Sequence, residues 1–440
     1  MKAIDRSILT EVFWRNKGGI MQEQELYING TRIYSLTNHD LHSFCLSLYI
    51  RAGSIFEDIT ENGISHLFEH MVFRNLKNKY ENFYHVMAKR GIDFGGCTYK
   101  EFIKFTVTGP SYEFDFASDI LCGVFDEIVL DPCAFASEKK RIKAEMRERD
   151  ERNSLHYLFN KAVWHDTEAE KTILGYCSVI DRISLRKLNE FGRKILSRDN
   201  CFFYVTGNAS DEDIGRLGRK AEALDISQTS PGFANTITLN RDFFHRDGKI
   251  KVKNGYWHYI KVGFDIDRKK YFGGIPDLLY DVLFIGEKSL VYDYLSENNP
   301  IIYSYDSTLE QYENVGNMNF NFEVNSDKLN DAVGAVVELL GAVKTGRFDY
   351  ESSLLSKLHC DELEWDNPEN LNFSLAYYNH ILDTVPYDRS DKYYGRYNVT
   401  KDEIVAAARD IFRPENMTVS VKGNNRKVDV GAIEEIMKTL

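Results

Sequence analysis

One pattern of hydrophobic and polar positions occurs twice along the chain. Residues 184–196 place apolar side chains at helical spacing, and a short turn leads into the apolar run 201–207, which ends in glycine. Residues 400–412 and 417–423 repeat this order, so that residue 184 corresponds to residue 400 at an offset of 216 residues. A repeat at about half the chain length indicates a duplicated domain, with one helix and one buried strand closing each copy.

The ends of the repeated helix and the segment between the copies set the expected boundaries. Thr400 and Glu403 have the spacing of a capping box, and Pro414 ends the second helix. Turn-forming residues gather where the first copy ends. We therefore expect an N-terminal domain at 1–225, a linker at 226–235 and a C-terminal domain at 236–440.

Each half begins with strand signals. The run Leu26–Tyr34 contains Asn29-Gly30, which favours a hairpin turn, and Phe44–Ile50 follows as a second apolar strand. In the second half the corresponding signal is His258–Phe264. Helical patterns follow the strands in blocks. The expected fold is α+β, with two homologous domains that each pack helices on one face of a mainly antiparallel sheet.

Composition narrows the class of protein. The 440 residues are 43% hydrophobic and 28% charged, which is typical of a globular protein, and no apolar run approaches the roughly 18 residues of a membrane span. The formal charge of −12 argues against a nucleic-acid surface. The seven cysteines follow no paired spacing, and the start of the chain lacks an apolar signal segment. We expect reduced thiols and a cytoplasmic location.

The strongest chemical signal is the sequence His66-Leu-Phe-Glu69-His70. Residues four apart project from one side of a helix, so the two imidazoles can hold one metal ion. Glu69 lies beside His70, where its carboxylate can take a proton from a water molecule that zinc has acidified. This order, His-x-x-Glu-His, is the inverse of the commoner His-Glu-x-x-His motif. The alternative is that both histidines simply pack in the interior.

The flanking residues favour metal binding. Gly63-Ile-Ser65 supplies a turn and an expected N-cap, and Leu67, Phe68 and Met71 give the helix an apolar side. A buried helix that carries two histidines and a glutamate needs a partner for these polar groups, and a metal ion is the simplest one.

A catalytic zinc site with two histidines needs a third protein ligand. The charged helical segment 137–151 offers several carboxylates, among them Glu138, Glu145 and Glu148 on one stripe. A solvated face with ordinary ion pairs explains such a segment equally well. Residue types and spacing alone do not select one of these glutamates.

A resemblance does select one. Gly53–Glu57 followed by Gly63–Phe73 resembles the pitrilysin/insulinase family of zinc peptidases, in particular its mitochondrial-processing-peptidase-like branch. In that family a glutamate ligand follows the inverted motif at a distance that Glu145 matches, 75 positions after His70, and Glu138 matches a supporting glutamate seven positions earlier. The resemblance implies one zinc ion per chain, held by His66, His70 and Glu145, with Glu69 as general base and Glu138 in support. It also implies two halves that face each other across a chamber.

A peptide-binding strand is expected between the motif and the distal glutamate. The second half of Gly91–Gly109 alternates and is rich in β-branched and aromatic residues, and Gly95-Gly96 marks a close approach of another backbone or an ordinary hairpin. A free strand edge binds an extended peptide by main-chain pairing. The candidate substrate-binding residues of this segment are Gly95, Gly96, Cys97 and Thr98.

Two positions depart from the family pattern. Relatives carry Asn-Ala where this chain has Gly95-Gly96, although Thr98 fits. Relatives also use an Arg and a Tyr from the C-terminal half to bind the substrate carbonyl. Here Tyr303 matches the tyrosine, but Ser296 stands at the arginine position and cannot supply a guanidinium group.

The resulting interpretation is a zinc metalloendopeptidase that cuts short or unfolded peptides, including leader or precursor peptides. Because Ser296 replaces the arginine, we expect a heterodimer in which a homologous subunit supplies the Arg/Tyr pair, with a homodimer as the second choice. The alternative is a peptide-capturing or scaffolding subunit that has lost turnover. Neither interpretation involves nucleic acid or a membrane span.

Overall fold

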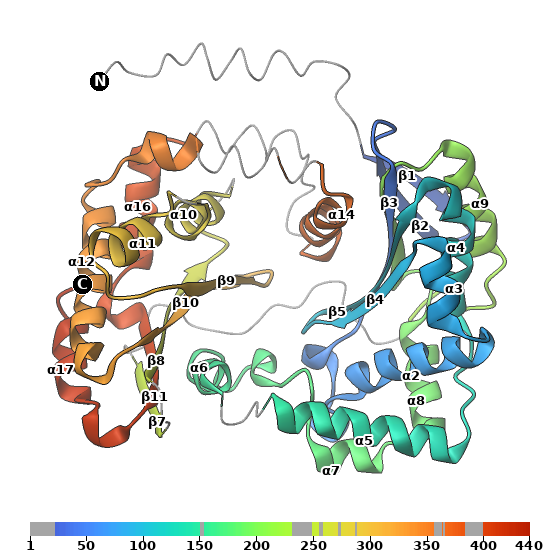
Figure 1. Ribbon diagram of the computed structural model, residues 1–440, viewed down its shortest axis with the longest axis horizontal. Coiled ribbons are helices and arrows are strands. Elements are labelled where there is room, and N and C mark those ends of the chain that lie inside the picture. The colour runs from blue at the N-terminus through green and yellow to red at the C-terminus, as the bar shows by residue number, and fades with distance from the viewer. Residues whose placement is uncertain are drawn as a thin grey trace.

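The computed structural model describes residues 23–149, 154–230, 249–254, 258–271, 274–286, 288–355, 363, 366–382 and 399–440. Within these residues the chain forms two β-sheets that face each other, with most helices on their outer sides (Figure 1). This is the predicted α+β class with two similar halves. The described residues contain no helix that is long and apolar enough to cross a membrane.

The N-terminal half contains a six-stranded sheet in the order β1-β2-β6-β3-β5-β4. Only β2 and β6 pair in parallel, and the other neighbours are antiparallel. The strands are β1 (Gln24–Ile28), β2 (Thr31–Thr37), β3 (Ser43–Arg51), β4 (Asp93–Thr98), β5 (Phe102–Pro110) and β6 (Cys201–Gly207). Among the described strands, β4 is therefore an edge strand with a neighbour on one side only.

The C-terminal half contains a five-stranded sheet in the order β7-β11-β8-β10-β9. It repeats the first sheet in having one parallel pair, β7 with β11. The strands are β7 (Lys249–Asn254), β8 (His258–Asp267), β9 (Tyr305–Gln311), β10 (Val315–Val324) and β11 (Met417–Gly423).

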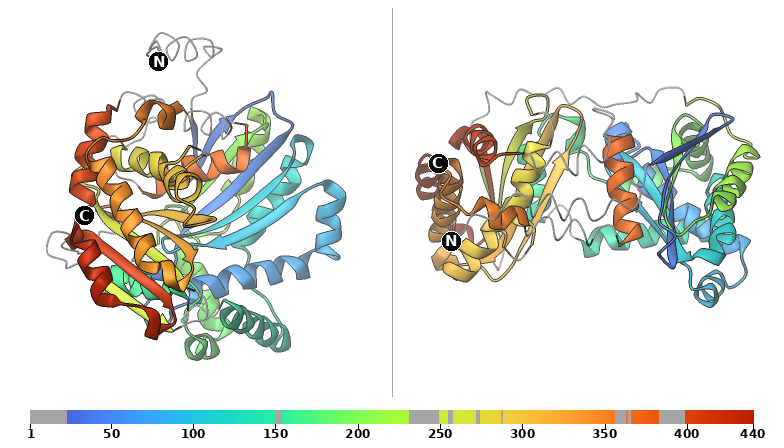
Figure 2. Two further views of the ribbon diagram at one scale, coloured as in Figure 1. Left: turned by 60° about the vertical axis from the view of Figure 1, so that its left-hand side comes forward. Right: turned by 90° about the horizontal axis from the view of Figure 1, so that it is seen from above.

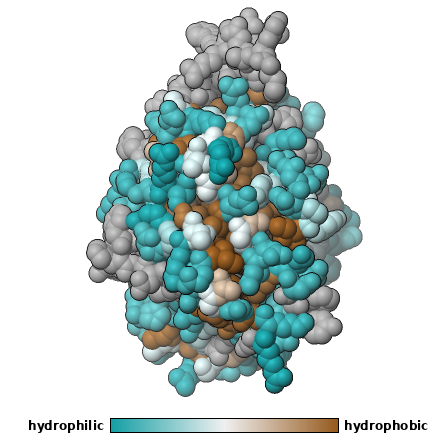
Figure 3. All heavy atoms as spheres, turned by 90° about the vertical axis from the view of Figure 1, so that its left-hand side faces the viewer, coloured by the Kyte–Doolittle hydropathy of each residue, from teal (hydrophilic) through white to brown (hydrophobic). Residues whose placement is uncertain are grey.

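Helices cover the outer face of each sheet, and their apolar sides fill two separate cores. The outer surface of the C-terminal half is largely hydrophilic, with apolar side chains showing between polar ones (Figure 3). The N-terminal half carries α2 (Ile64–Lys79), α3 (Phe83–Arg90), α4 (Phe114–Cys122), α5 (Pro132–Glu148), α7 (Cys177–Arg182), α8 (Leu185–Ile195) and α9 (Asp211–Glu222). The C-terminal half carries α10 (Ile275–Phe284), α11 (Leu290–Tyr292), the π-helical turn η6 (Asp293–Asn298), α12 (Leu329–Lys344), α16 (Lys401–Ile411) and α17 (Val430–Met437).

The inner face of each sheet is covered by one helix from the other half, which the sequence did not reveal. Helix α6 (Leu155–Val163) packs on β7, β8 and β11, and α14 (Pro368–Ala376) packs on β3 and β6 (Figures 1 and 2). Asn372 of α14 bonds to two adjacent central strands of the first sheet. It accepts a hydrogen bond from the Tyr49 hydroxyl on β3 at 2.9 Å and donates one to the Tyr204 carbonyl on β6 at 2.9 Å. The prediction of helices on one face is therefore incomplete, because the halves exchange a helix.

The predicted repeat holds at atomic detail. Helices α8 and α16 and strands β6 and β11 differ at both ends by the expected offset. Asn200 donates its side-chain amide to the Ile195 carbonyl at 2.8 Å, and Asn416 donates to the Ile411 carbonyl at 2.8 Å. An equivalent asparagine amide therefore joins the end of the helix to the start of the following strand in both copies.

Several local predictions are also confirmed. Asn29 and Gly30 have positive φ values of 46° and 90° in the turn between β1 and β2. Thr400 and Glu403 form the complete capping box at the start of α16. The linker expected at 226–235 is described only for residues 226–230, of which Ser227 pairs with Ser197 of the first half, so the domain limits stay a prediction.

A partly buried ion pair joins the halves. The Lys100 ammonium, in the hairpin between β4 and β5, lies 2.8 Å from Oε1 of Glu310 on β9, and the Trp164 indole donates to Oε2 of Glu310 at 2.9 Å. Burial favours the protonated form of Glu310, but Lys100 and the hydrogen bonds outweigh it and lower the pKa of the carboxyl to about 2. These contacts fix the β4–β5 hairpin against the second sheet.

Candidate metal site

The metal motif begins a helix whose first turn is capped from outside. Gly63 occupies the N-cap position with φ 97°, and the buried carboxylate of Glu57 accepts hydrogen bonds from the backbone N–H groups of Gly63 at 2.7 Å and Ser65 at 2.9 Å. The Asn62 amide donates to the same carboxylate at 2.8 Å. Burial raises the pKa of Glu57, although these hydrogen bonds oppose the rise. Glu57 therefore satisfies two of the backbone donors at the start of α2.

The N-cap predicted within Gly63–Ser65 is confirmed at Gly63, but no side chain of this segment makes the capping hydrogen bond. The Ser65 hydroxyl does not cap α2 but accepts a hydrogen bond from the Gly53 N–H at 3.0 Å. The local residues indicated the turn but carried no signal that the distant Glu57 would supply the acceptors.

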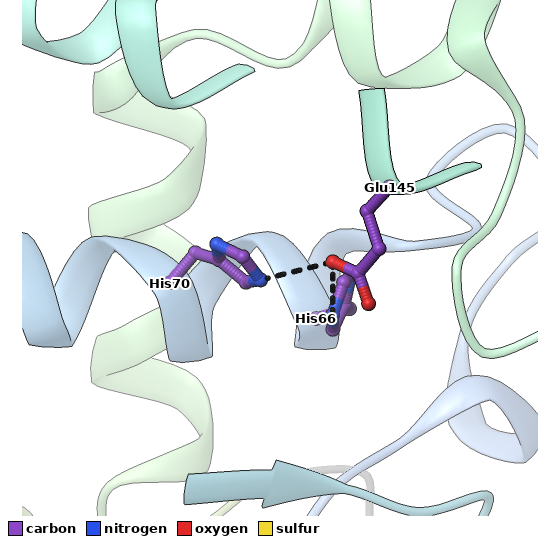
Figure 4. A group of neighbouring side chains, drawn as sticks. All are labelled: His66, His70 and Glu145. Atoms are coloured by element: carbon purple, nitrogen blue, oxygen red, sulfur yellow. Dashed lines mark ion pairs between the residues drawn. The ribbon is translucent and has the colours of Figure 1, made fainter. Parts of the chain in front are cut away.

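The structure brings His66, His70 and Glu145 together (Figure 4). The two imidazoles come from α2 and the carboxylate from α5, and one ligand atom of each lies within 4.8 Å of the others. Oε2 of Glu145 is 3.7 Å from Nε2 of His66 and 3.5 Å from Nε2 of His70. Within the described residues one further metal-like group occurs, at His165, Asp166 and Glu170, and its first two members are exposed.

These distances fit a zinc ion. Metal–ligand bonds of about 2.0–2.2 Å in a tetrahedral arrangement place neighbouring ligand atoms roughly 3.3 Å apart. Burial lowers the pKa of His66 to about 3, and the nearby His70 and Arg149 act in the same direction. His66 is therefore neutral at physiological pH, which is the form that binds a metal. The observed separations need only a small contraction around an ion.

Neighbouring side chains orient two of the three groups. Nδ1 of His70 lies 3.1 Å from Oε1 of Glu138, so its Nε2 is left to face Glu145. The other oxygen of Glu145, Oε1, pairs with the Arg149 guanidinium at 2.8 Å. Burial opposes ionisation of Glu138, but His70 and Arg141 outweigh it and lower the pKa of the carboxyl. Glu138 thus lies beside His70, and its supporting role stays a prediction.

Glu69 is buried between α2 and the edge strand β4. Its Oε2 accepts a hydrogen bond of 2.6 Å from the Thr98 hydroxyl. Burial raises the pKa of Glu69, while the Thr98 hydrogen bond opposes the rise. A carboxylate whose pKa lies above its ordinary value is better suited to accept a proton near neutral pH.

The glycine pair of β4 lies within the strand and not in a hairpin turn. A Cβ atom on Gly96 would meet Cε2 of Phe73 at 2.6 Å and Oε1 of Glu69 at 3.2 Å, so glycine lets β4 lie against α2. The expected close approach of another backbone is therefore wrong for Gly96, because side chains of α2 make it. The strand expected in the second half of this segment is β5, which lies inside the sheet, whereas the glycine pair belongs to a separate strand, β4, at the edge.

Tyr303 is not brought into this cluster. It lies between η6 and β9 with 94% of its surface exposed, and no contact joins it to the site in the part of the chain that the structure describes. Ser296 lies in η6 of the same half. A role for Tyr303 stays a prediction.

Comparisons with known proteins show a likeness to zinc proteases. Residues 32–176 match the profile described as insulinase, peptidase family M16. The chain is 22% identical over 322 residues to an uncharacterized zinc protease of Bacillus subtilis, YmxG, an alignment that covers 72% of this chain and 77% of that protein. It is 23% identical over 223 residues to the beta subunit of the mitochondrial-processing peptidase of Saccharomyces cerevisiae, of which it spans about half, 47%.

Solved structures share the whole fold. A protease from Helicobacter pylori superimposes with a TM-score of 0.80 at 16% identity, covering 92% of this chain and 100% of that one. An inactive domain of peptidase M16 from Pseudomonas fluorescens superimposes with a TM-score of 0.78 at 15% identity, covering 92% of this chain and 98% of that one. At such identities the likeness concerns the fold, so activity has to be argued from the residues of this chain.

Proposed function

We propose that this chain, whose matched region belongs to peptidase family M16, is a zinc metalloendopeptidase subunit that cleaves short or unfolded peptides. The observation that carries this proposal is the convergence of His66, His70 and Glu145 from two helices, with Glu69 buried beside them. Zinc is the metal named for the relative from Bacillus subtilis. Nitrogen and carboxylate ligands in this number are also those of catalytic zinc sites.

Each residue has a distinct task. His66 and His70 would hold the ion through Nε2 and Glu145 through Oε2, one ion per chain. A zinc ion in this site would lower the pKa of a bound water to about 7 and polarise the scissile carbonyl. Glu69 then accepts the water proton at its carboxylate and passes it to the leaving amine. Glu138 keeps the ring of His70 in its metal-facing orientation.

Strand β4 is the proposed substrate edge. Among the described strands, Asp93–Thr98 has a neighbour on one side only; Thr98 bonds Glu69, and a Cβ atom added to Gly96 would meet the Glu69 carboxylate. A peptide that pairs with this edge would lie along the general base. Main-chain pairing makes little demand on sequence, which suits substrates that are unfolded, such as leader or precursor peptides.

We further propose that a homologous subunit completes the site. Ser296 stands where relatives carry an arginine, and Tyr303 is exposed. The yeast relative is itself named as a subunit. The six described cysteines form no disulfide, which fits a reducing compartment such as the cytoplasm.

The test compares the Glu69→Gln variant with the parent chain. Each is assayed by itself and together with a homologue encoded nearby. Zinc content is measured by elemental analysis, and turnover is measured on a mixed pool of quenched fluorescent peptides. The proposal expects chelator-sensitive cleavage by the parent, and full zinc without cleavage for Glu69→Gln. Cleavage by Glu69→Gln at the normal rate contradicts the role of the carboxylate. Full turnover by the isolated chain contradicts the need for a second subunit.

A second candidate is a peptide-capturing or scaffolding subunit without turnover. Gly95-Gly96 and Ser296 favour it, because the amide and guanidinium groups expected at these positions are missing. In that case the chain binds zinc and peptide. The peptide pool is then not cleaved by this chain alone or with any partner, as long as this chain carries the metal site.

A further inference from the structure

Lys104 lies beside the proposed substrate edge and is a buried lysine that has no counter-charge among the described residues. It lies on β5 with 9% of its surface exposed, and its ammonium is 5.2 Å from the ring centre of Phe373 on α14. Within the described residues no carboxylate and no hydrogen-bond acceptor contacts its Nζ. Burying an ammonium is costly unless a partner compensates, so this position calls for an anion that the described part of the chain does not provide.

The pairing of β4 with β5 shows where this ammonium lies. Cys97 is directly opposite Lys104, and Gly95 is opposite Thr106. Gly96 and Thr98 face Glu69 of α2, so the alternation of a strand directs Gly95 and Cys97 to the other face, that of Lys104. Burial raises the pKa of the Cys97 thiol, and the Lys104 ammonium is close enough to oppose that rise.

The face above Gly95 is open. A Cβ atom built on Gly95 would meet no other atom within 4 Å, in contrast to its neighbour Gly96. A peptide strand added to β4 would be separated from β5 by two strand spacings, roughly 10 Å. A lysine and a glutamate that extend toward each other can span this distance, and glycine leaves the space between them free.

We propose that Lys104 and the open position at Gly95 form a subsite for a carboxylate of the bound peptide. The carboxylate is either an Asp or Glu side chain or the C-terminal group. The inference rests on the proposed function only in requiring that a peptide pair with β4. It does not require that the peptide be cut.

The experiment therefore measures binding and not turnover. Zinc-loaded full-length chain carrying Glu69→Gln captures peptides from a synthetic library of random decamers, prepared with free and with amidated C-termini, and mass spectrometry reads the captured sequences. The same capture is run with Lys104→Met and with Lys104→Arg added. Lys401→Met is the matched control, since Lys401 also lies over an aromatic ring, Phe348 at 4.9 Å, in the C-terminal half. Thermal melting checks that each variant is folded.

The expected result is enrichment of Asp and Glu over Asn and Gln at one position, or of free over amidated C-termini, by about tenfold, as for a charge-assisted hydrogen bond. Lys104→Met should abolish this preference, whereas Lys104→Arg and Lys401→Met should keep it. Which arm of the library is enriched identifies the source of the carboxylate. Equal enrichment with folded Lys104→Met overturns the subsite. Capture of no peptide at all overturns the proposed function as well.

Discussion

The Thr98 hydroxyl donates a hydrogen bond of 2.6 Å to Oε2 of Glu69, although 29 residues separate the two in sequence. This bond ties the edge strand β4 to the helix that carries both histidines. It also fixes the direction of the buried Glu69 carboxylate. The strand that would receive the peptide and the proposed general base are therefore placed by one contact.

Thr98→Val keeps the shape of the side chain and removes this hydrogen bond. Because burial already raises the pKa of Glu69 and Thr98 opposes the rise, the pKa should rise further, and the acid limb of the kcat profile should move to higher pH. We expect kcat to fall by roughly tenfold with unchanged zinc content. The control is Thr345→Val, whose hydroxyl bonds the exposed end of α12. An unshifted acid limb in Thr98→Val would exclude the positioning role.

Glu138→Gln tests the support of His70. The carboxylate that faces Nδ1 at 3.1 Å becomes an amide, which holds the ring less strongly. Zinc affinity, measured by competition with a chromogenic chelator, should weaken by about 10–100-fold. Glu148→Gln removes an equal charge from an exposed position of the same helix and should leave the affinity unchanged. If both variants bind zinc equally well, Glu138 does not support the site.

Glu57→Ala tests the external cap of α2. The change leaves the N–H groups of Gly63 and Ser65 and the Asn62 amide buried without their acceptor. We expect the free energy of unfolding to fall by about 3 kcal/mol. Glu61 lies in the same loop as Glu57 and pairs with Lys187 of α8. Glu61→Ala breaks this ion pair and should lower the free energy of unfolding by less than about 1 kcal/mol. Chemical denaturation of both variants measures the difference, and similar losses would contradict the capping role.

Glu101, which lies at the junction of the halves, makes the stability of the protein depend on pH. Burial raises the pKa of its carboxyl to about 8, although Arg51, Arg268 and Lys100 oppose the rise. The folded chain thus holds a proton that the unfolded chain has lost, so stability falls as pH rises from about 4.5 to 8. Glu101→Gln should melt at a higher temperature than the parent at pH 8.5 and at the same temperature near pH 4. A difference that does not change with pH would contradict this assignment.

The amino-acid sequence predicted those features whose signals are local or repeated. The offset between α8 and α16 appears in the apolar pattern itself, and the turn at Asn29 has its own residue signature. His66 and His70 are one helical turn apart, so their convergence follows from helix geometry. The fold class and the pairing of the two histidines therefore follow from short-range patterns alone.

Features made by long-range packing had no such signal. Glu145 was selected only by resemblance, because several carboxylates share its helix. The cap from Glu57, the bond from Thr98 to Glu69 and the exchange of α6 and α14 each join segments whose sequences are independent. The sequence of a glycine pair is the same whether the pair forms a turn or leaves room for a side chain such as Phe73. Only the packing in the folded protein distinguishes these two roles.

The most direct test of the account is the zinc content of the purified chain beside that of Glu145→Gln and Glu148→Gln, measured by elemental analysis after dialysis against a weak chelator. The account predicts about one equivalent of zinc for the parent and for Glu148→Gln, and a large loss for Glu145→Gln. Full zinc retention by Glu145→Gln, or a parent chain that binds no zinc, would contradict the proposed metal site.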